Sequence, residues 1–202
     1  MELFTLSDLP ENKKTVVVKS TSKKVKPKSV LFSHAAQTAE SVIGKIKKNT
    51  DIHFVSSAEW STIDLLVAIL KQTGPASVMI ATWSASEDST RKLLEMTAKG
   101  MITSIKAIFD WRLKVRRPEV YEFAKFKIAD VRLTSCHAKV TVIRNNKYNI
   151  VINASGNYTH NPRIEAGVIS ESADVANFHE SWMLKEHANA DPFNTKKRNK
   201  KG

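Results

Sequence analysis

The sequence predicts an α/β fold in which a mixed β-sheet is flanked by helices within a single domain. Its 202 residues suit one domain with a sizeable core. The middle of the chain alternates short apolar runs with segments of helical periodicity, which is typical of parallel strands joined by helices. The last third holds apolar runs joined by short links, which favours antiparallel strands.

Three segments are expected along the chain. Residues 1–30 are polar and basic and would form an arm or an edge strand. Residues 31–190 would carry the folded domain, and residues 191–202 would form a basic tail. The tail suits either contact with phosphates or simple solvation.

The first elements of the domain are a helix, a strand and a second helix. The first helix is expected over residues 33–48, where apolar residues recur on one side, and the strand over residues 52–55. The second helix begins at Ser61, whose spacing from Asp64 resembles a capping box, and it ends at Gly74.

A buried strand is predicted over residues 77–83, because this run is apolar almost throughout. Trp83 ends the run and could border a cleft, although a core position suits it better. Ser86 caps the following helix, which ends at Gly100. A third strand is predicted over residues 104–110.

The last third begins after a helix that Pro118 opens. Four short strands are expected there, in the sequences VRLTS, HAKVTVI, YNIVINA and EAGVIS. Residues 144–147 carry the signal of a hairpin turn. A final helix follows Asp174 and turns Phe178 and Trp182 inward.

Charge narrows the classes of function. Lys and Arg number 32 against 20 Asp and Glu, a formal net charge of +12. This excess favours a polyanionic partner, either nucleic acid or an anionic membrane surface. No run approaches the roughly 20 apolar residues of a membrane-spanning helix, and no amphipathic membrane helix or lipid signal is evident. We therefore expect nucleic acid and no membrane partner.

Basic residues gather near the N-terminus, in the tail and in the segment DWRLKVRRPE. Trp111 in this segment offers a stacking face beside cations, a pairing that suits nucleic acid, although Trp111 alone fits better as a core residue. The residues expected to bind nucleic acid are Lys23, Lys24, Lys26, Arg112, Arg116 and Arg117.

The single cysteine and the first residues bear on the compartment. Cys136 cannot form an internal disulfide, and it cannot build a zinc site without several partners. The start of the sequence lacks the basic and then apolar pattern of a secretory signal. We expect a cytoplasmic protein that uses no metal and no cofactor.

Chemically useful side chains meet in the segment HAKVTVIRNNKYNIVINASGN. His137 and Lys139 are two apart on an expected strand, so they share a face, and Ser155 and Asn157 are two apart at the end of the next strand. Ammonium, hydroxyl and carboxamide groups suit a phosphate, and an imidazole can attack phosphorus or transfer a proton. Glu165 begins the following strand and could orient the imidazole.

Each of these residues also has a simpler interpretation. His137 could be a buried polar residue, Lys139 a solvent-facing strand residue, and Ser155 and Asn157 turn residues beside Gly156. Their occurrence together favours the catalytic interpretation.

The segment resembles the motif of the phospholipase D superfamily, which is His-x-Lys, then Asp, then Gly-Ser-x-Asn. His137 and Lys139 match the first part, and Ser155 and Asn157 match the last, with Ala154 in place of the first Gly. The resemblance covers roughly residues 52–186 and implies a phospholipase D-like domain. Two departures are a longer spacing, which the hairpin turn can absorb, and Arg144 at the position of the Asp.

The resemblance implies a metal-independent phosphodiesterase. One His attacks phosphorus and forms a phosphohistidine, a second His protonates the leaving oxygen, and water then releases the product. The chain holds one His-x-Lys, so the site would be shared by the two protomers of a homodimer. Small single-motif members act on nucleic acid, which favours DNA or RNA as substrate.

Two alternatives remain at this point. The departure at Arg144 is consistent with an inactive member that only binds nucleic acid. A phospholipid-acting enzyme is the third hypothesis, ranked last because the sequence carries no lipid signal.

Overall fold

Eight strands and six helices make up the described part of this computed structural model, residues 26–32, 38–57, 60–128, 130–160 and 162–190. The strands are β1 (Lys26–Phe32), β2 (Thr50–Ser57), β3 (Ala76–Thr82), β4 (Ile102–Asp110), β5 (Val131–Thr134), β6 (Val140–Arg144), β7 (Asn149–Ala154) and β8 (Ile164–Glu171). The helices are α1 (Ala39–Ile43), α2 (Thr62–Thr73), α3 (Glu87–Ala98), α4 (Arg112–Arg116), α5 (Pro118–Lys127) and α6 (Ala173–Asn189).

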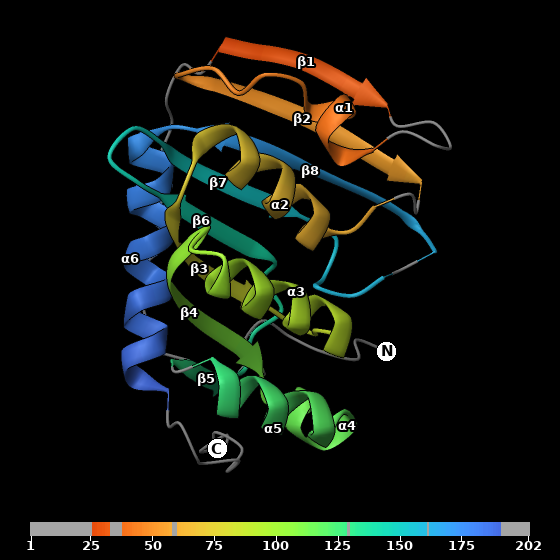
Figure 1. Ribbon diagram of the computed structural model, residues 1–202, viewed down its shortest axis with the longest axis vertical. Helices are drawn as coiled ribbons and strands as arrows, with labels where there is room; N and C mark the ends of the chain where they lie inside the picture. The colour runs from red at the N-terminus through yellow and green to blue at the C-terminus, as the bar shows by residue number, and fades with distance from the viewer. Residues whose placement is uncertain (1–25, 33–37, 58–59, 129, 161, 191–202) are drawn as a thin grey trace, which may run out of the picture.

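All eight described strands lie in one sheet, in the order β1-β2-β8-β7-β6-β3-β4-β5 (Figure 1). β3, β4 and β5 are parallel, and β1 is parallel to β2. β6, β7 and β8 form an antiparallel meander that joins these two parallel groups. The predicted mixed sheet is therefore confirmed. β5 was expected among the antiparallel strands of the last third, but it is parallel to β4.

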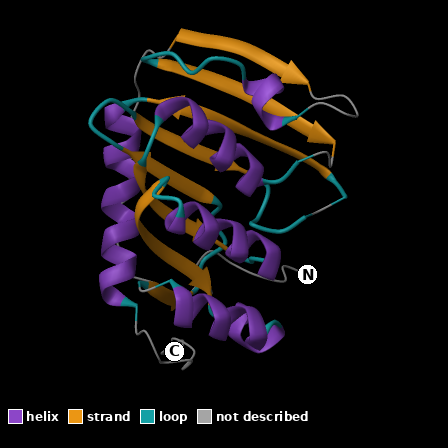
Figure 2. Ribbon diagram, viewed as in Figure 1, coloured by secondary structure: helices purple, strands orange, loops and turns teal. Residues whose placement is uncertain are grey.

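Helices cover both faces of the sheet, and the alternation of side chains along β3 shows why. Val78 and Ile80 belong to the larger core under α1, α2, α3 and α5, whereas Met79 and Ala81 belong to a smaller core under α6. Figure 2 shows α2, α3 and α5 side by side over one face. A strand buried on both faces is typically a nearly continuous apolar run, as residues 78–81 of β3 are.

Most helix limits follow the predicted caps. Ser61 and Asp64 form the expected capping box, Ser86 caps α3 through the backbone N–H of Ser89, and Pro118 opens α5. No described helix is long and apolar enough to cross a membrane.

The helix predicted over residues 33–48 is much shorter in the structure. Residues 33–37 lie outside the described residues, and α1 ends at Gly44, which has φ of 57°. Glycine adopts this left-handed region without strain, so the helix stops there. Ile46 still packs into the core, where its N–H donates to Gln72 Oε1 over 3.1 Å. The apolar periodicity continues beyond the helix because Ile46, in the following loop, is also buried, and this pattern led to the prediction of a longer helix.

The expected N-terminal segment overlaps the sheet, because β1 crosses residue 30 and forms its edge strand. Lys23, Lys24 and the tail over residues 191–202 lie outside the described residues, and of Lys26 only the backbone is described.

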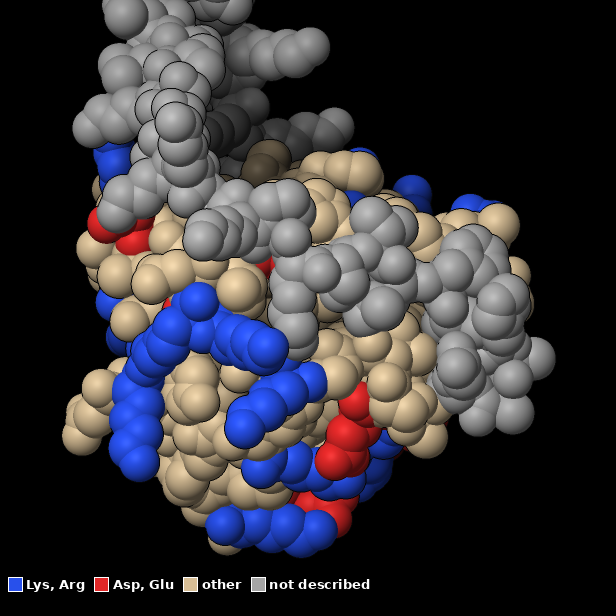
Figure 3. Space-filling model, turned by 90° about the horizontal axis from the view of Figure 1, so that it is seen from above, with Lys and Arg blue, Asp and Glu red and all other residues tan. Residues whose placement is uncertain are grey.

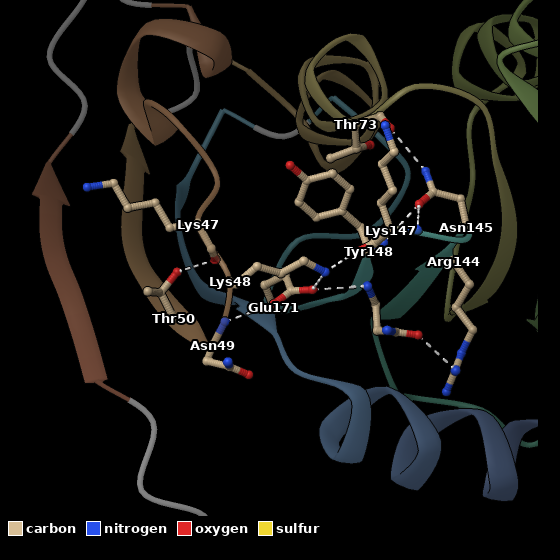
Figure 4. Close-up of polar contacts among 11 residues, drawn as sticks. Lys47, Lys48, Asn49, Thr50, Thr73, Arg144, Asn145, Lys147, Tyr148 and Glu171 are labelled. Carbon is tan, nitrogen blue, oxygen red and sulfur yellow. Dashed lines mark hydrogen bonds and ion pairs between the residues drawn. The ribbon is translucent and has the colours of Figure 1, made fainter.

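A buried carboxylate ties three strands together at one edge of the sheet (Figure 4). Glu171, at the end of β8, is 3% exposed and accepts hydrogen bonds from Lys48 Nζ and from the backbone N–H groups of Asn49 and Asn149. These contacts fix β8 between β2 and β7. The first residues of β8, including Glu165, consequently lie at the opposite edge.

We predict that Gly167→Ala destabilises the protein by about 1–3 kcal/mol, the usual cost of overpacking a filled site. A methyl carbon there would lie 2.7 Å from Ala154 Cβ, Asn153 O and Phe54 Cζ. Urea unfolding would measure the change, with Ala166→Ser as the control at an exposed position of the same strand. Equal stability of the two variants would contradict the tight approach of β2, β7 and β8.

Candidate active site

All eight described strands have one end at the same edge of the sheet. β1 to β5 and β7 end there, and β6 and β8 begin there, because Ala81 pairs with Val140, Ala154 with Gly167 and Ser57 with Ile164. The five candidate catalytic residues all lie at this edge, before β6, after β7 or at the start of β8.

His137 and Lys139 precede β6 rather than lying on it, so the prediction that they sit on a strand is wrong. Strand pairing reaches only the carbonyl of Lys139, which accepts from Ala154 N–H over 3.2 Å. Lys139 Nζ turns back and donates to His137 O over 2.9 Å, and the His137 side chain is exposed. The hairpin still places Lys139 opposite Ala154, the residue before Ser155.

The segment carrying His137 is held by Asp110, at the end of β4. Its carboxylate is fully buried and accepts from the N–H of Cys136 over 3.0 Å and from Arg112 Nε over 2.6 Å. Burial raises the pKa of this carboxyl, but the hydrogen bonds from Arg112 and Cys136 outweigh it and hold the pKa below its ordinary value. Asp110 is therefore a charged anchor for Cys136, the residue before His137.

Sequence reasoning missed this role of Asp110. The sequence predicts only that Asp110 ends a strand. The pattern that could have revealed its role is an Asp at the end of an apolar run, with an Arg two residues later.

Trp83, just after β3, lies against His137. The two ring centroids are 5.9 Å apart with their planes inclined at 54°. The guanidinium carbons of Arg112 and Arg116 lie 5.6 Å and 5.4 Å from the Trp83 centroid. Trp83 is half-buried rather than a core residue, which differs from the expectation. Trp111 packs against the core, as expected.

Ser155 and Glu165 contact each other across the start of β8. The Ser155 hydroxyl donates to Glu165 Oε2, and Ala166 N–H donates to the same hydroxyl over 3.0 Å. Glu165 was expected to orient His137, and the structure gives it Ser155 as a partner. Burial lowers the pKa of Lys139, and Glu165 only partly offsets this effect, so the two side chains are electrostatically coupled.

Asn157 is held by the neighbouring strand and by its own loop. Thr82 Oγ1 lies 3.3 Å from Asn157 Oδ1 and 3.0 Å from Ser84 O, and its single hydroxyl proton can be donated to one of them at a time. The next residue, Tyr158, is buried and shares a 2.6 Å hydrogen bond with Thr141 Oγ1. Its N–H also donates to Ser84 O, so the loop is fixed against β3 and β6.

The fold resembles that of solved structures, including the two that follow, whereas no family model and no curated protein matches the chain. NucT from Helicobacter pylori aligns with 71% of this chain and 99% of its own, at a TM-score of 0.56 and 17% identity. Nuc from Salmonella typhimurium, described as a phospholipase D family member, aligns with 72% and 99% at a TM-score of 0.54 and 19% identity. The chain has the phospholipase D fold.

Within the phospholipase D fold, Arg144 lies at the far end of β6 from the candidate site (Figure 4). The strand from Val140 to Arg144 spans roughly 13 Å. Arg144 donates to Asn149 Oδ1 over 3.0 Å and pairs with Glu180 over 3.2 Å, so it links β7 to α6. The departure from the motif at this position is thus a structural contact away from His137.

We predict that Asp110→Asn lowers stability by about 2 kcal/mol at pH 7, the size of hydrogen bonds to a charged group. Because folding lowers the pKa of Asp110, its contribution is present above the unfolded value near 3.8 and is lost as pH falls below it. The difference from wild type, measured by urea unfolding across pH, should therefore shrink in acid. A difference that stays constant down to pH 2 would contradict the ionised anchor, and the exposed Asp88→Asn serves as control.

Proposed function

We propose that the chain is a metal-independent phosphodiesterase that cuts DNA or RNA through a phosphohistidine, at a site shared by two protomers. The observation that carries the proposal is the exposed His137 beside Lys139, at the edge where Ser155, Asn157 and Glu165 also lie. The phospholipase D fold supports the class of reaction.

The proposed reaction has two displacements. An imidazole nitrogen of His137 forms a bond to phosphorus while the bond from phosphorus to the leaving oxygen breaks, and His137 of the partner subunit gives that oxygen its proton. Water then loses a proton to the same partner imidazole and attacks phosphorus, which breaks the bond to His137 and restores both groups.

Lys139 and Asn157 would stabilise the charge that develops on the phosphoryl oxygens. An ammonium and amide N–H donors held in place before the reaction lower the barrier, because they need no reorganisation. Asn157 is held by Thr82, and Lys139 by the carbonyl of His137. Glu165 would act indirectly, by keeping the Ser155 hydroxyl in position.

Charge supports nucleic acid as the substrate. The sequence carries a net charge of +12, and on the face drawn in Figure 3 Lys and Arg gather with fewer Asp and Glu among them. A strand of DNA or RNA offers repeated phosphates to such a surface. Arg112, Arg116 and Arg117, at α4 on the side of the molecule away from that view, are the described cations that we propose for contact with the substrate.

An inactive nucleic-acid-binding module is the second candidate, and Arg144 at the motif position motivates it. Such a module would bind nucleic acid without turnover. Its affinity would fall with salt at a log–log slope of about −0.9 per phosphate neutralised on duplex DNA.

We predict that His137→Ala abolishes cleavage in excess EDTA while it keeps binding, because the nucleophile and the acid are both lost. Labelled single- and double-stranded DNA and RNA would be the substrates, and the exposed His53→Ala the control. Full activity of His137→Ala would rule out the mechanism. In mixtures that exchange subunits, activity should fall with the square of the wild-type fraction if two protomers share a site.

We predict that Arg144→Gln changes cleavage less than about threefold, since it lies away from the chemistry, but lowers stability by about 1–2 kcal/mol through its lost contacts. Parallel cleavage and urea-unfolding measurements would separate the two effects. Loss of cleavage in a variant that folds normally would contradict the assignment of Arg144 to a structural contact away from the chemistry.

A further inference from the structure

Two arginines close to Trp83 are not paired with a carboxylate in the described part of the chain, unlike Arg112, which pairs with Asp110. Arg91 and Arg132 pair with Glu87 and Asp130. Arg116 and Arg117 are exposed, and within the described ranges neither has a carboxylate partner. Arg116 lies over the ring of Trp83, which in turn contacts the candidate nucleophile His137.

The same residues line a pocket of about 270 Å³, formed by Trp83, Ser84, Arg112, Leu113, Arg116 and Arg117. α4 places Arg112 and Arg116 four residues apart, so both reach the Trp83 ring from one face of the helix. Asp110 fixes Arg112 through two of its N–H groups. The pocket thus holds two guanidinium groups oriented in advance by a ring and a carboxylate.

We propose that this pocket binds the phosphate next to the scissile one, and that Arg116 is its principal ligand. The inference rests on the proposed function and deepens it: the substrate is a strand with at least two consecutive phosphates, rather than an isolated phosphodiester. Contact between Trp83 and His137 places the pocket directly beside the reacting group. Guanidinium groups suit a phosphate because their planar N–H donors match its oxygens in pairs.

The test compares a dinucleoside monophosphate, which has only the scissile phosphate, with the same compound carrying an added 5′ or 3′ terminal phosphate. In wild type, one of the two added phosphates should raise kcat/KM by about 10- to 100-fold, the worth of hydrogen bonds to a charged group. Arg116→Gln should bring this ratio close to one.

A matched control is Lys127→Gln, which removes one positive charge from a cation that also lies over an aromatic ring, Phe126, at 5.0 Å. It should keep the wild-type ratio. Trp83→Leu should lower the ratio, and Trp83→Phe should restore part of it, because a ring again holds the guanidinium groups.

The outcomes separate the pocket from the proposed chemistry. Turnover of both compounds with equal ratios in wild type and Arg116→Gln would overturn the second phosphate site and leave the phosphodiesterase standing. Absence of turnover would rule out the proposed phosphodiesterase activity. The ratio of the Kd values for the same compounds would then show whether the pocket binds the added phosphate. A Kd ratio near one in wild type would overturn it.

Discussion

The buried carboxylate of Asp110 is the constraint on which the candidate site depends. It lies where β4 ends, and it reaches in two directions, to the N–H before His137 and to the guanidinium of Arg112. A fully buried carboxylate needs such partners, because an unpaired charge away from water is costly. The hydrogen bonds that Asp110 accepts therefore hold in place both the backbone next to His137 and the guanidinium of Arg112 in the neighbouring pocket.

Rigidity of the edge comes from several independent contacts of this kind. Tyr158 holds the loop after Asn157, and Ser155 holds the start of β8 through its backbone and through Glu165. The functional groups come from three strand ends, before β6, after β7 and at the start of β8, as is common where loops on a rigid sheet carry the chemistry. Small rearrangements elsewhere in the fold would then leave the relative positions of these groups intact.

Sequence patterns predicted the sheet and most helix caps because both depend on local spacing. The apolar run of β3, the capping box at Ser61 and the proline at the start of α5 each act within a few residues. The short α1 and the irregular segment before β6 were missed because Gly44 and Asp110 decide them, one by backbone conformation and one by a contact 26 residues away. The contact of Trp83 with His137 likewise depends on distant residues meeting.

The position of β8 in the sheet has a consequence for folding during synthesis. β8 pairs with β2 on one side and with β7 on the other, so β1 and β2 gain an inner neighbour only after residue 171 has emerged. Until then β1 and β2 cannot pair with the rest of the sheet. Pairing β2 with β8 joins residues more than 100 positions apart in the sequence, which is slow compared with the pairing of strands that are close in sequence. The edge that gathers the candidate residues is therefore completed late, by the same segment that carries Glu165.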